Sequence, residues 1–144
     1  MGIRNRVQDA LLLYENGHYE GAFLNALVAV AATARRECSD KNVSDRDCFE
    51  KFLDKKRRGV ISIEFRGECH TIPHIFYKWF RCELVHEGGL PIDVEFIDSD
   101  ALSIRAGGAP EYVLKMSRGW FHWIIRAVIE APCNRDDFLE IIQE

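Results

Sequence analysis

Two residues in the segment FYKWFRCELVHEGGLP (76–91) have side chains suited to phosphodiester chemistry, Arg81 and His86. The imidazole of histidine titrates near neutral pH, so His86 can take a proton from a ribose 2′-hydroxyl or give one to the leaving 5′-oxygen. The guanidinium of Arg81 stays protonated and can bind phosphoryl oxygens while negative charge builds on them. The pair is therefore suited to cleavage of RNA by its own 2′-hydroxyl, a reaction that requires no metal ion and spares DNA.

The spacing of Arg81 and His86 sets a condition on such a site. Five positions on an α-helix rotate by about 500°, or about 140° net, so the two side chains lie on different stripes. They converge only if the last helical turn loosens before Gly88, or if each faces a shared cleft from its own side. The alternative is that both residues have only structural roles: His86 would be a cation at a helix C-terminus, and Arg81 would form a surface ion pair with Glu83 or Glu87.

The periodicity of apolar residues predicts a mainly α chain around this segment. Helices are predicted over 3–15 and 19–38, and the stop at Gly17 between them implies an antiparallel hairpin. Ser44 is predicted to cap a third helix, which ends at the basic run 55–58. The stretch at 14–22 is similar to the turn of a tetratricopeptide unit, but no matching segment follows at the period of that repeat, so this alternative is the weaker one.

The later part of the chain alternates helices with short extended segments. The helix that carries the motif is predicted over 71–86, with Thr71 as its N-cap. A fifth helix is predicted after Gly108 and up to Ala131, and Asn134 is predicted to cap a last short helix.

Extended chain is predicted at 60–65, and the alternating runs 92–97 and 102–105 predict a β-hairpin. The expected fold is an up-and-down helical bundle of about five to six helices with a small β-hairpin insertion.

The motif and the order of the elements together resemble the HEPN superfamily. Arg81 is followed by four residues and then His86 at the end of a helix, as in the Arg-x(4–6)-His motif of that superfamily. A helical hairpin with an alanine-rich second helix precedes the motif, and Glu87-Gly88 follows the histidine, as in many members. The resemblance spans the chain, and it implies a single HEPN-like helical domain over residues 1–144.

The resemblance implies a function and partners. Many HEPN proteins are metal-independent endoribonucleases that act as toxins or in defence against phage, so RNA is the expected substrate and a cognate antitoxin a possible partner. The active unit is expected to be a homodimer through the helix at 71–86, since one chain supplies one motif histidine and cleavage needs both an acid and a base. The large aromatic side chains are numerous for one small bundle, which points to the same interface: Phe76, Trp79, Trp120, Phe121 and Trp123.

One position departs from the HEPN pattern. In catalytic members the residue after the arginine is typically Asn, Asp or His, whereas here it is Cys82. Cys82 lies one helical turn before His86, and a thiol is a weak hydrogen-bonding group at that place. The second hypothesis is therefore a catalytically weak or inactive HEPN module that binds RNA, a nucleotide or a protein partner. The third is a purely structural helical interaction domain.

Several other residues are candidates to support the motif or to bind RNA. Lys78 lies one turn before Arg81, and Glu87 follows His86. Tyr77 has a ring on which a base could stack, although packing in the core or in a dimer is the more ordinary role. Arg35 and Arg36 end the second helix, where a solvated basic face is the more ordinary role.

A metal site is the weaker chemical alternative. Cys69, His70, His74, Cys82 and His86 lie close together in the sequence, but a helix start interrupts the first histidine pair and no Cys-x2-Cys knuckle is present. No nucleophile elbow surrounds any cysteine. No metal ion or other cofactor is therefore expected.

The composition fits one domain with a sizeable core. The chain has 144 residues, of which 47% are hydrophobic and 29% charged. It has no apolar run long enough for a membrane helix and no signal-peptide pattern, so a cytoplasmic protein without membrane contact is expected. The five cysteines are odd in number and scattered, which favours reduced thiols. The net charge of −4 does not indicate a nucleic-acid-binding protein, but a local basic site remains possible.

Overall fold

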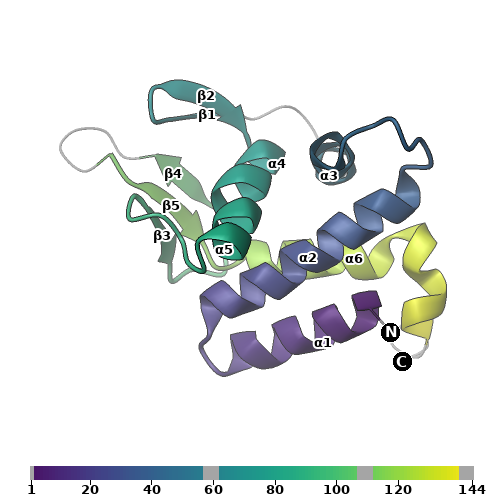
Figure 1. Cartoon of the computed structure of the whole chain (residues 1–144). Helices are drawn as coiled ribbons and strands as arrows, with labels where there is room; N and C mark the ends of the chain where they lie inside the picture. Colours follow the sequence, from purple (N-terminus) through teal and green to yellow (C-terminus); the bar gives the residue numbers. More distant parts are fainter. Residues whose placement is uncertain (1, 57–61, 107–111, 140–144) are drawn as a thin grey trace.

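Helix α2 (Tyr19–Glu37) is the centre of the fold, and most other helices pack against it (Figure 1). The structure is a computed structural model that describes residues 2–56, 62–106 and 112–139. Helix α1 (Gly2–Glu15) runs antiparallel beside α2, as predicted. The chain reverses at Gly17, whose φ of +79° is a conformation that side chains with a Cβ rarely adopt.

Helix α3 (Asp45–Asp54) begins at the predicted cap. The Asp47 N–H donates to Ser44 Oγ at 3.1 Å. The helix lies near the C-terminal end of α2 and ends at Asp54, next to the predicted basic stop, of which residues 57 and 58 lie outside the described residues. Its apolar face contributes four buried residues to the core: Cys48, Phe49, Phe52 and Leu53.

A short antiparallel hairpin follows, formed by β1 (Ser62–Phe65) and β2 (Glu68–Thr71). The turn residues Arg66 and Gly67 both have positive φ, 53° and 80°, which a two-residue hairpin turn requires. Extended chain was predicted at 60–65, and the described part of that range, from residue 62, is β1. The pairing with β2 was not predicted.

The helix that carries the motif begins and ends where the sequence predicts. The His74 N–H donates to Thr71 Oγ1 at 3.3 Å, which makes Thr71 the N-cap. Gly88, with a φ of +77°, follows the last turn. The helix has three consecutive parts: α4 (Ile72–Ile75), the π-helix η1 (Phe76–Cys82) and α5 (Glu83–His86).

A three-stranded sheet lies at one end of the bundle, beside this helix (Figure 1). Its strands are β3 (Val94–Ile97), β4 (Ile104–Ala106) and β5 (Leu114–Ser117). The central strand β5 pairs in parallel with β3 and antiparallel with β4. The predicted hairpin between 92–97 and 102–105 is therefore wrong, although each run contains a strand. Alternation marks a strand but does not identify its neighbour, and here β5 lies between the two.

Strand β5 also shortens the predicted fifth helix. That helix was expected after Gly108, but residues 114–117 form β5, and helix α6 (Trp120–Glu130) begins only after the turn at Gly119. A Cβ at Gly119 would lie 2.6 Å from the Ala101 carbonyl oxygen, so the turn is packed tightly against that loop. Ser117, which is buried, donates to the same carbonyl through its Oγ and accepts from the Ser103 N–H at 2.9 Å. Tertiary contacts therefore determine where α6 starts. Residues 107–111, where the helix was expected to begin, lie outside the described residues.

The last described helix is the 3-10 helix η2 (Pro132–Phe138). Asn134 does not cap it, contrary to the prediction. Its side chain is fully buried and bonds to α2 and to the end of α6 instead.

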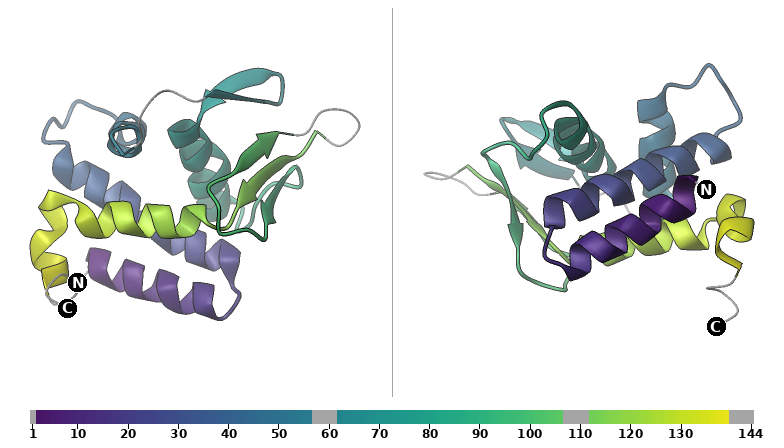
Figure 2. Two further views of the ribbon diagram at one scale, coloured as in Figure 1. Left: turned by 180° about the vertical axis from the view of Figure 1, so that it is seen from behind. Right: turned by 60° about the horizontal axis from the view of Figure 1, so that its bottom comes forward.

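The core lies between α2 and the elements around it. Seen from behind, α6 lies along α2 with α1 beside it (Figure 2). The predicted mainly α class with small β elements is confirmed. Of the aromatic residues expected at a dimer interface, Phe76, Trp79, Trp120 and Phe121 are buried inside the chain, and Trp123 is partly buried against the same core. They therefore give no support to an interface. Within the described residues, no helix is long and apolar enough to span a membrane.

Candidate functional site

Arg81 is a half-buried cation without a carboxylate partner in the described chain. Its guanidinium carbon lies 5.6 Å from the centroid of the Tyr77 ring, one turn earlier on η1. Its Nε is buried and has no hydrogen-bond partner among the described residues. Neither Glu83 nor Glu87 forms the surface ion pair with Arg81 that the purely structural alternative requires. Other arginines do have carboxylate partners: Arg6, Arg35, Arg36, Arg46, Arg66, Arg118 and Arg126.

The π-helix η1 arranges the residues around Arg81. In a π-helix, backbone hydrogen bonds join residues five apart, so side chains at that spacing come close together; such segments are rare and are frequent at functional sites. Tyr77 and Cys82 are five residues apart and interact. Burial, and next the Cys82 thiol, raises the pKa of Tyr77 above its usual value, while the charge of Arg81 lowers it. Cys82 therefore interacts with Tyr77, which the sequence pattern did not predict.

Tyr77 also connects the motif to α3. Its ring packs edge to face on Phe49, with centroids 5.3 Å apart. Tyr77 is therefore partly committed to packing, which was the alternative to a base-stacking role. Its ring forms a platform between α3 and Arg81, which restricts the positions available to the guanidinium.

His86 is exposed at the end of α5. The last turn does not loosen, since the Glu87 N–H donates to the Glu83 carbonyl oxygen at 2.8 Å. The chain after Gly88 is tied to the start of α2 by the Leu90 N–H, which donates to Glu20 at 3.2 Å. Of the two conditions for convergence of Arg81 and His86, only the shared cleft remains. The structure does not bring the two side chains of one chain together, and Glu87 is exposed beside the histidine.

Arg35 belongs to the scaffold and not to the motif. Its three guanidinium nitrogens contact Asp45 at 3.0 Å, Cys48 at 3.0 Å and the Val43 carbonyl at 2.8 Å. These contacts join the end of α2 to the loop before α3 and to α3 itself. An arginine held in this way has little capacity left for a phosphate.

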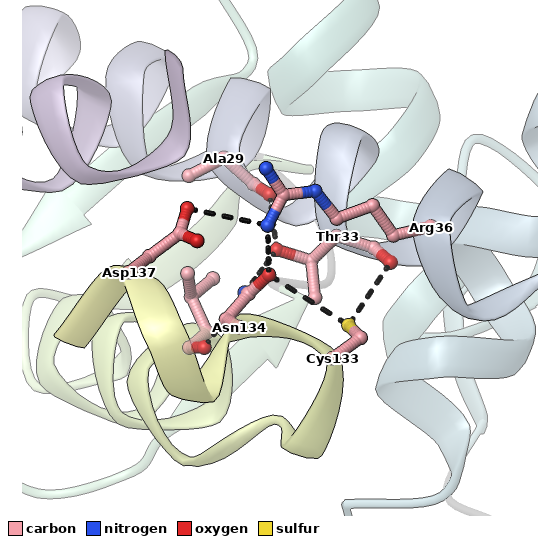
Figure 3. A network of polar contacts seen from close by, with 7 residues as sticks. Ala29, Thr33, Arg36, Cys133, Asn134 and Asp137 are labelled. Carbon is pink, nitrogen blue, oxygen red and sulfur yellow. Dashed lines mark hydrogen bonds and ion pairs between the residues drawn. The ribbon is translucent and has the colours of Figure 1, made fainter. Parts of the chain in front are cut away.

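Arg36 has a similar structural role at the other side of α2 (Figure 3). It donates to Asn134 Oδ1 at 3.1 Å and to Asp137 at 3.2 Å. The Asn134 amide in turn donates to Thr33 Oγ1 at 2.8 Å. The network fixes η2 on α2, so Arg36 holds the fold together.

Lys78 lines a hollow of about 490 Å³ between α3 and the start of the motif helix. Its Nζ lies 4.9 Å from the centroid of the Trp79 ring. In the same hollow, His74 Nδ1 and Glu50 Oε1 are 2.6 Å apart, and the rings of His70 and His74 stack with centroids 5.2 Å apart. The two histidines were candidates from the sequence, but Glu50 was not, because its carboxylate comes from α3 and only packing brings it there.

The described residues offer no metal cluster. Nowhere in ranges 2–56, 62–106 and 112–139 do three or more His, Cys, Asp or Glu side chains gather closely enough to hold a metal ion. In the hollow, Glu50 and His74 therefore form a hydrogen-bonded pair, and His70 stacks on His74. The Glu50 carboxylate fixes the orientation of the His74 ring.

A family model described as Rv1289 matches residues 2–140 of the 144-residue chain. No curated protein and no solved structure matches it. The family match includes every described element, from α1 to η2, and the whole motif helix. The chain belongs to the Rv1289 family.

Proposed function

We propose that this protein is an endoribonuclease of the HEPN type, in which Arg81 binds the scissile phosphate and His86 moves a proton. The observation that carries the proposal is that the Arg81 Nε is buried and has no hydrogen-bond partner among the described residues. Removing a guanidinium from water is unfavourable unless oxygens replace the lost hydration, and the described chain supplies none to its Nε. Phosphate oxygens would supply them once the side chain turns outward and exposes the Nε, in the geometry that the fork of an arginine prefers.

The active unit that we propose is a homodimer with composite sites. Within one chain, Arg81 and His86 lie about 7.5 Å apart along an α-helical axis and about 140° apart around it. The π-helical geometry at Arg81 and Cys82 narrows that angle, but the four residues that follow, Glu83–His86, are α-helical. A two-fold axis beside α5 would place the partner subunit's His86 near Arg81, and the same again in the other site. Val85, which is 47% exposed next to His86, gives that face an apolar residue.

The test of the chemistry is cleavage of a mixed RNA by the purified protein in the presence of EDTA. We expect products that end in a 2′,3′-cyclic phosphate, and a loss of activity in Arg81→Ala and in His86→Ala. Arg126→Ala and His122→Ala are the matched controls, since both residues are exposed on α6, and they should cleave as the parent does. Parental rates in either motif variant, with folding intact, would show that the assigned roles are wrong.

The test of the composite site is complementation. Mixing equal amounts of the Arg81→Ala and His86→Ala proteins gives mixed dimers in half of the molecules, each with one intact site of two. About a quarter of the parental activity should return. Sedimentation should give about twice the chain mass of 16.6 kDa. A fully active monomer, or no recovery on mixing, would contradict the composite site and leave the motif assignment standing.

A second function is favoured by Cys82. Its thiol replaces the polar residue that catalytic HEPN proteins carry, and it interacts with Tyr77. A module that binds RNA or a nucleotide through Arg81 without cleaving it fits that substitution. In that case a labelled RNA would bind the parent protein and not Arg81→Ala, and no cleavage would follow. A cytoplasmic toxin or defence protein, with an antitoxin as partner, is the biological setting that we propose for either form.

A further inference from the structure

The C-terminal end of α2 packs against α3 (Figure 1), and two cysteines, Cys38 and Cys48, lie at this junction. Cys38 follows the last residue of α2, and its N–H donates to the Ala34 carbonyl at 2.9 Å. Its side chain is half-buried. Cys48 lies in α3 with 3% of its surface exposed. Both line one small cavity of about 40 Å³, so the two thiols face a common space.

The Arg35 guanidinium contacts one of these two thiols. Its Nη1 lies 3.0 Å from Cys48 Sγ, and its other guanidinium nitrogens are anchored on Asp45 and Val43. The cation is thus fixed beside the Cys48 sulfur, and its charge also favours the thiolate of Cys38. A hydrogen bond from the Cys48 thiol, and further the nearby Arg35, lowers the pKa of Cys38 below its usual value. Burial raises the pKa of Cys48.

The two thiols therefore differ in a way that suits thiol–disulfide exchange. Cys38 is the more accessible and the more readily ionised, so it is the attacking group. Cys48 is almost fully buried, so an external disulfide reaches it less easily. The remaining cysteines lie on other elements, Cys69 on β2, Cys82 on η1 and Cys133 on η2.

We propose that Cys38 and Cys48 are a redox-sensitive pair that closes to an intramolecular disulfide in the presence of a low-molecular-weight disulfide such as glutathione disulfide. The Cys38 thiolate attacks one sulfur of the oxidant, forms a mixed disulfide and releases one glutathione thiolate. Cys48 then loses its proton and attacks Cys38 Sγ, and the second glutathione leaves as its thiolate. The two protein thiols are oxidised to a disulfide and lose two protons, and the two glutathione thiolates take up these protons to become thiols. This site is separate from the motif and does not depend on the ribonuclease proposal.

The experiment treats the folded full-length protein with glutathione disulfide near neutral pH, blocks free thiols and maps the linkage by mass spectrometry. Trypsin should release the peptides 37–41 (ECSDK) and 47–51 (DCFEK) as one linked pair. The chain mass should fall by about 2 Da without a retained glutathione. Cys48→Ser should instead retain one glutathione on Cys38, because the resolving thiol is gone.

A second variant tests the proposal even if Cys48→Ser does not fold. The triple variant Cys69→Ser, Cys82→Ser, Cys133→Ser keeps only the proposed pair and should form the linkage as the parent does. Exposed Cys69 and Cys133 are the internal controls and should stay unlinked to each other. Linkage that involves these cysteines at a similar rate, or no linked 37–41 and 47–51 peptides in the triple variant, would overturn the proposal.

Discussion

If Arg81 is held ready for a phosphate, replacing it should not weaken the fold. The buried Nε lacks a hydrogen bond, and an unmet buried donor costs roughly 1–3 kcal/mol. Arg81→Met removes that donor and keeps a flexible apolar side chain, but it loses the contact with Tyr77, worth about 0.5–1 kcal/mol. The free energy of unfolding should therefore stay level or rise by about 1 kcal/mol while RNA cleavage is lost.

The matched control is Arg36→Met, the same substitution on a neighbouring helix. It deprives the buried Asn134 of the hydrogen bond at 3.1 Å and Asp137 of its ion pair, so the free energy of unfolding should fall by about 2 kcal/mol. Urea denaturation followed by tryptophan fluorescence measures both, and equal slopes in urea would show that the unfolded states are comparable. A loss in Arg81→Met as large as in Arg36→Met would refute the reasoning, because Arg81 would then be a structural residue.

Three further results are expected. Gly119→Ala should lower the free energy of unfolding by about 3 kcal/mol in the same assay, since the new Cβ would stand 2.6 Å from the Ala101 carbonyl oxygen; a loss below about 1 kcal/mol would mean that the loop yields easily. Arg66 lowers the pKa of Asp93, so the ion pair adds stability above the usual carboxyl pKa of about 3.9, and this stability is lost as the pH falls through the lower pKa of the folded state. Asp93→Asn should therefore be less stable than the parent at neutral pH and equal to it in strong acid, as measured by denaturation across pH. Cys82→Asn should hold or raise RNA cleavage, because an amide can both donate and accept; a large loss with intact folding would assign the thiol a role of its own.

The sequence determined the elements whose signals are local. The helix start at Ser44, the start at Thr71 and the stops at Gly17 and Gly88 were all predicted, because a cap or a positive φ depends on a few neighbouring residues. The mainly α class followed from the same signals. The motif could be located on its helix, so the position of His86 at an exposed end was also predictable.

Pairing and packing could not be predicted in the same way. The alternating runs at 92–97 and 102–105 marked strands, but β5 between them was hidden inside a predicted helix, and its contacts with residues 99–103 decided the outcome. Asn134 had the spacing of a cap, yet its amide is buried against Thr33. A local pattern ranks conformations of one segment, whereas the partner of a strand or of a buried amide is set by segments far away in the sequence.

The candidate site divides along the same line. The sequence alone supplied Arg81 and His86 and the chemistry of which they are capable. Only the tertiary structure showed that Arg35 and Arg36 are paired with carboxylates and that Arg81 is not paired within the described residues. The carboxylates that pair with Arg35 and Arg36 come from α3 and η2. A charged side chain is paired only if the fold places an oppositely charged side chain within about 4 Å of it. The two partners can be far apart in the sequence, so the sequence alone does not identify them.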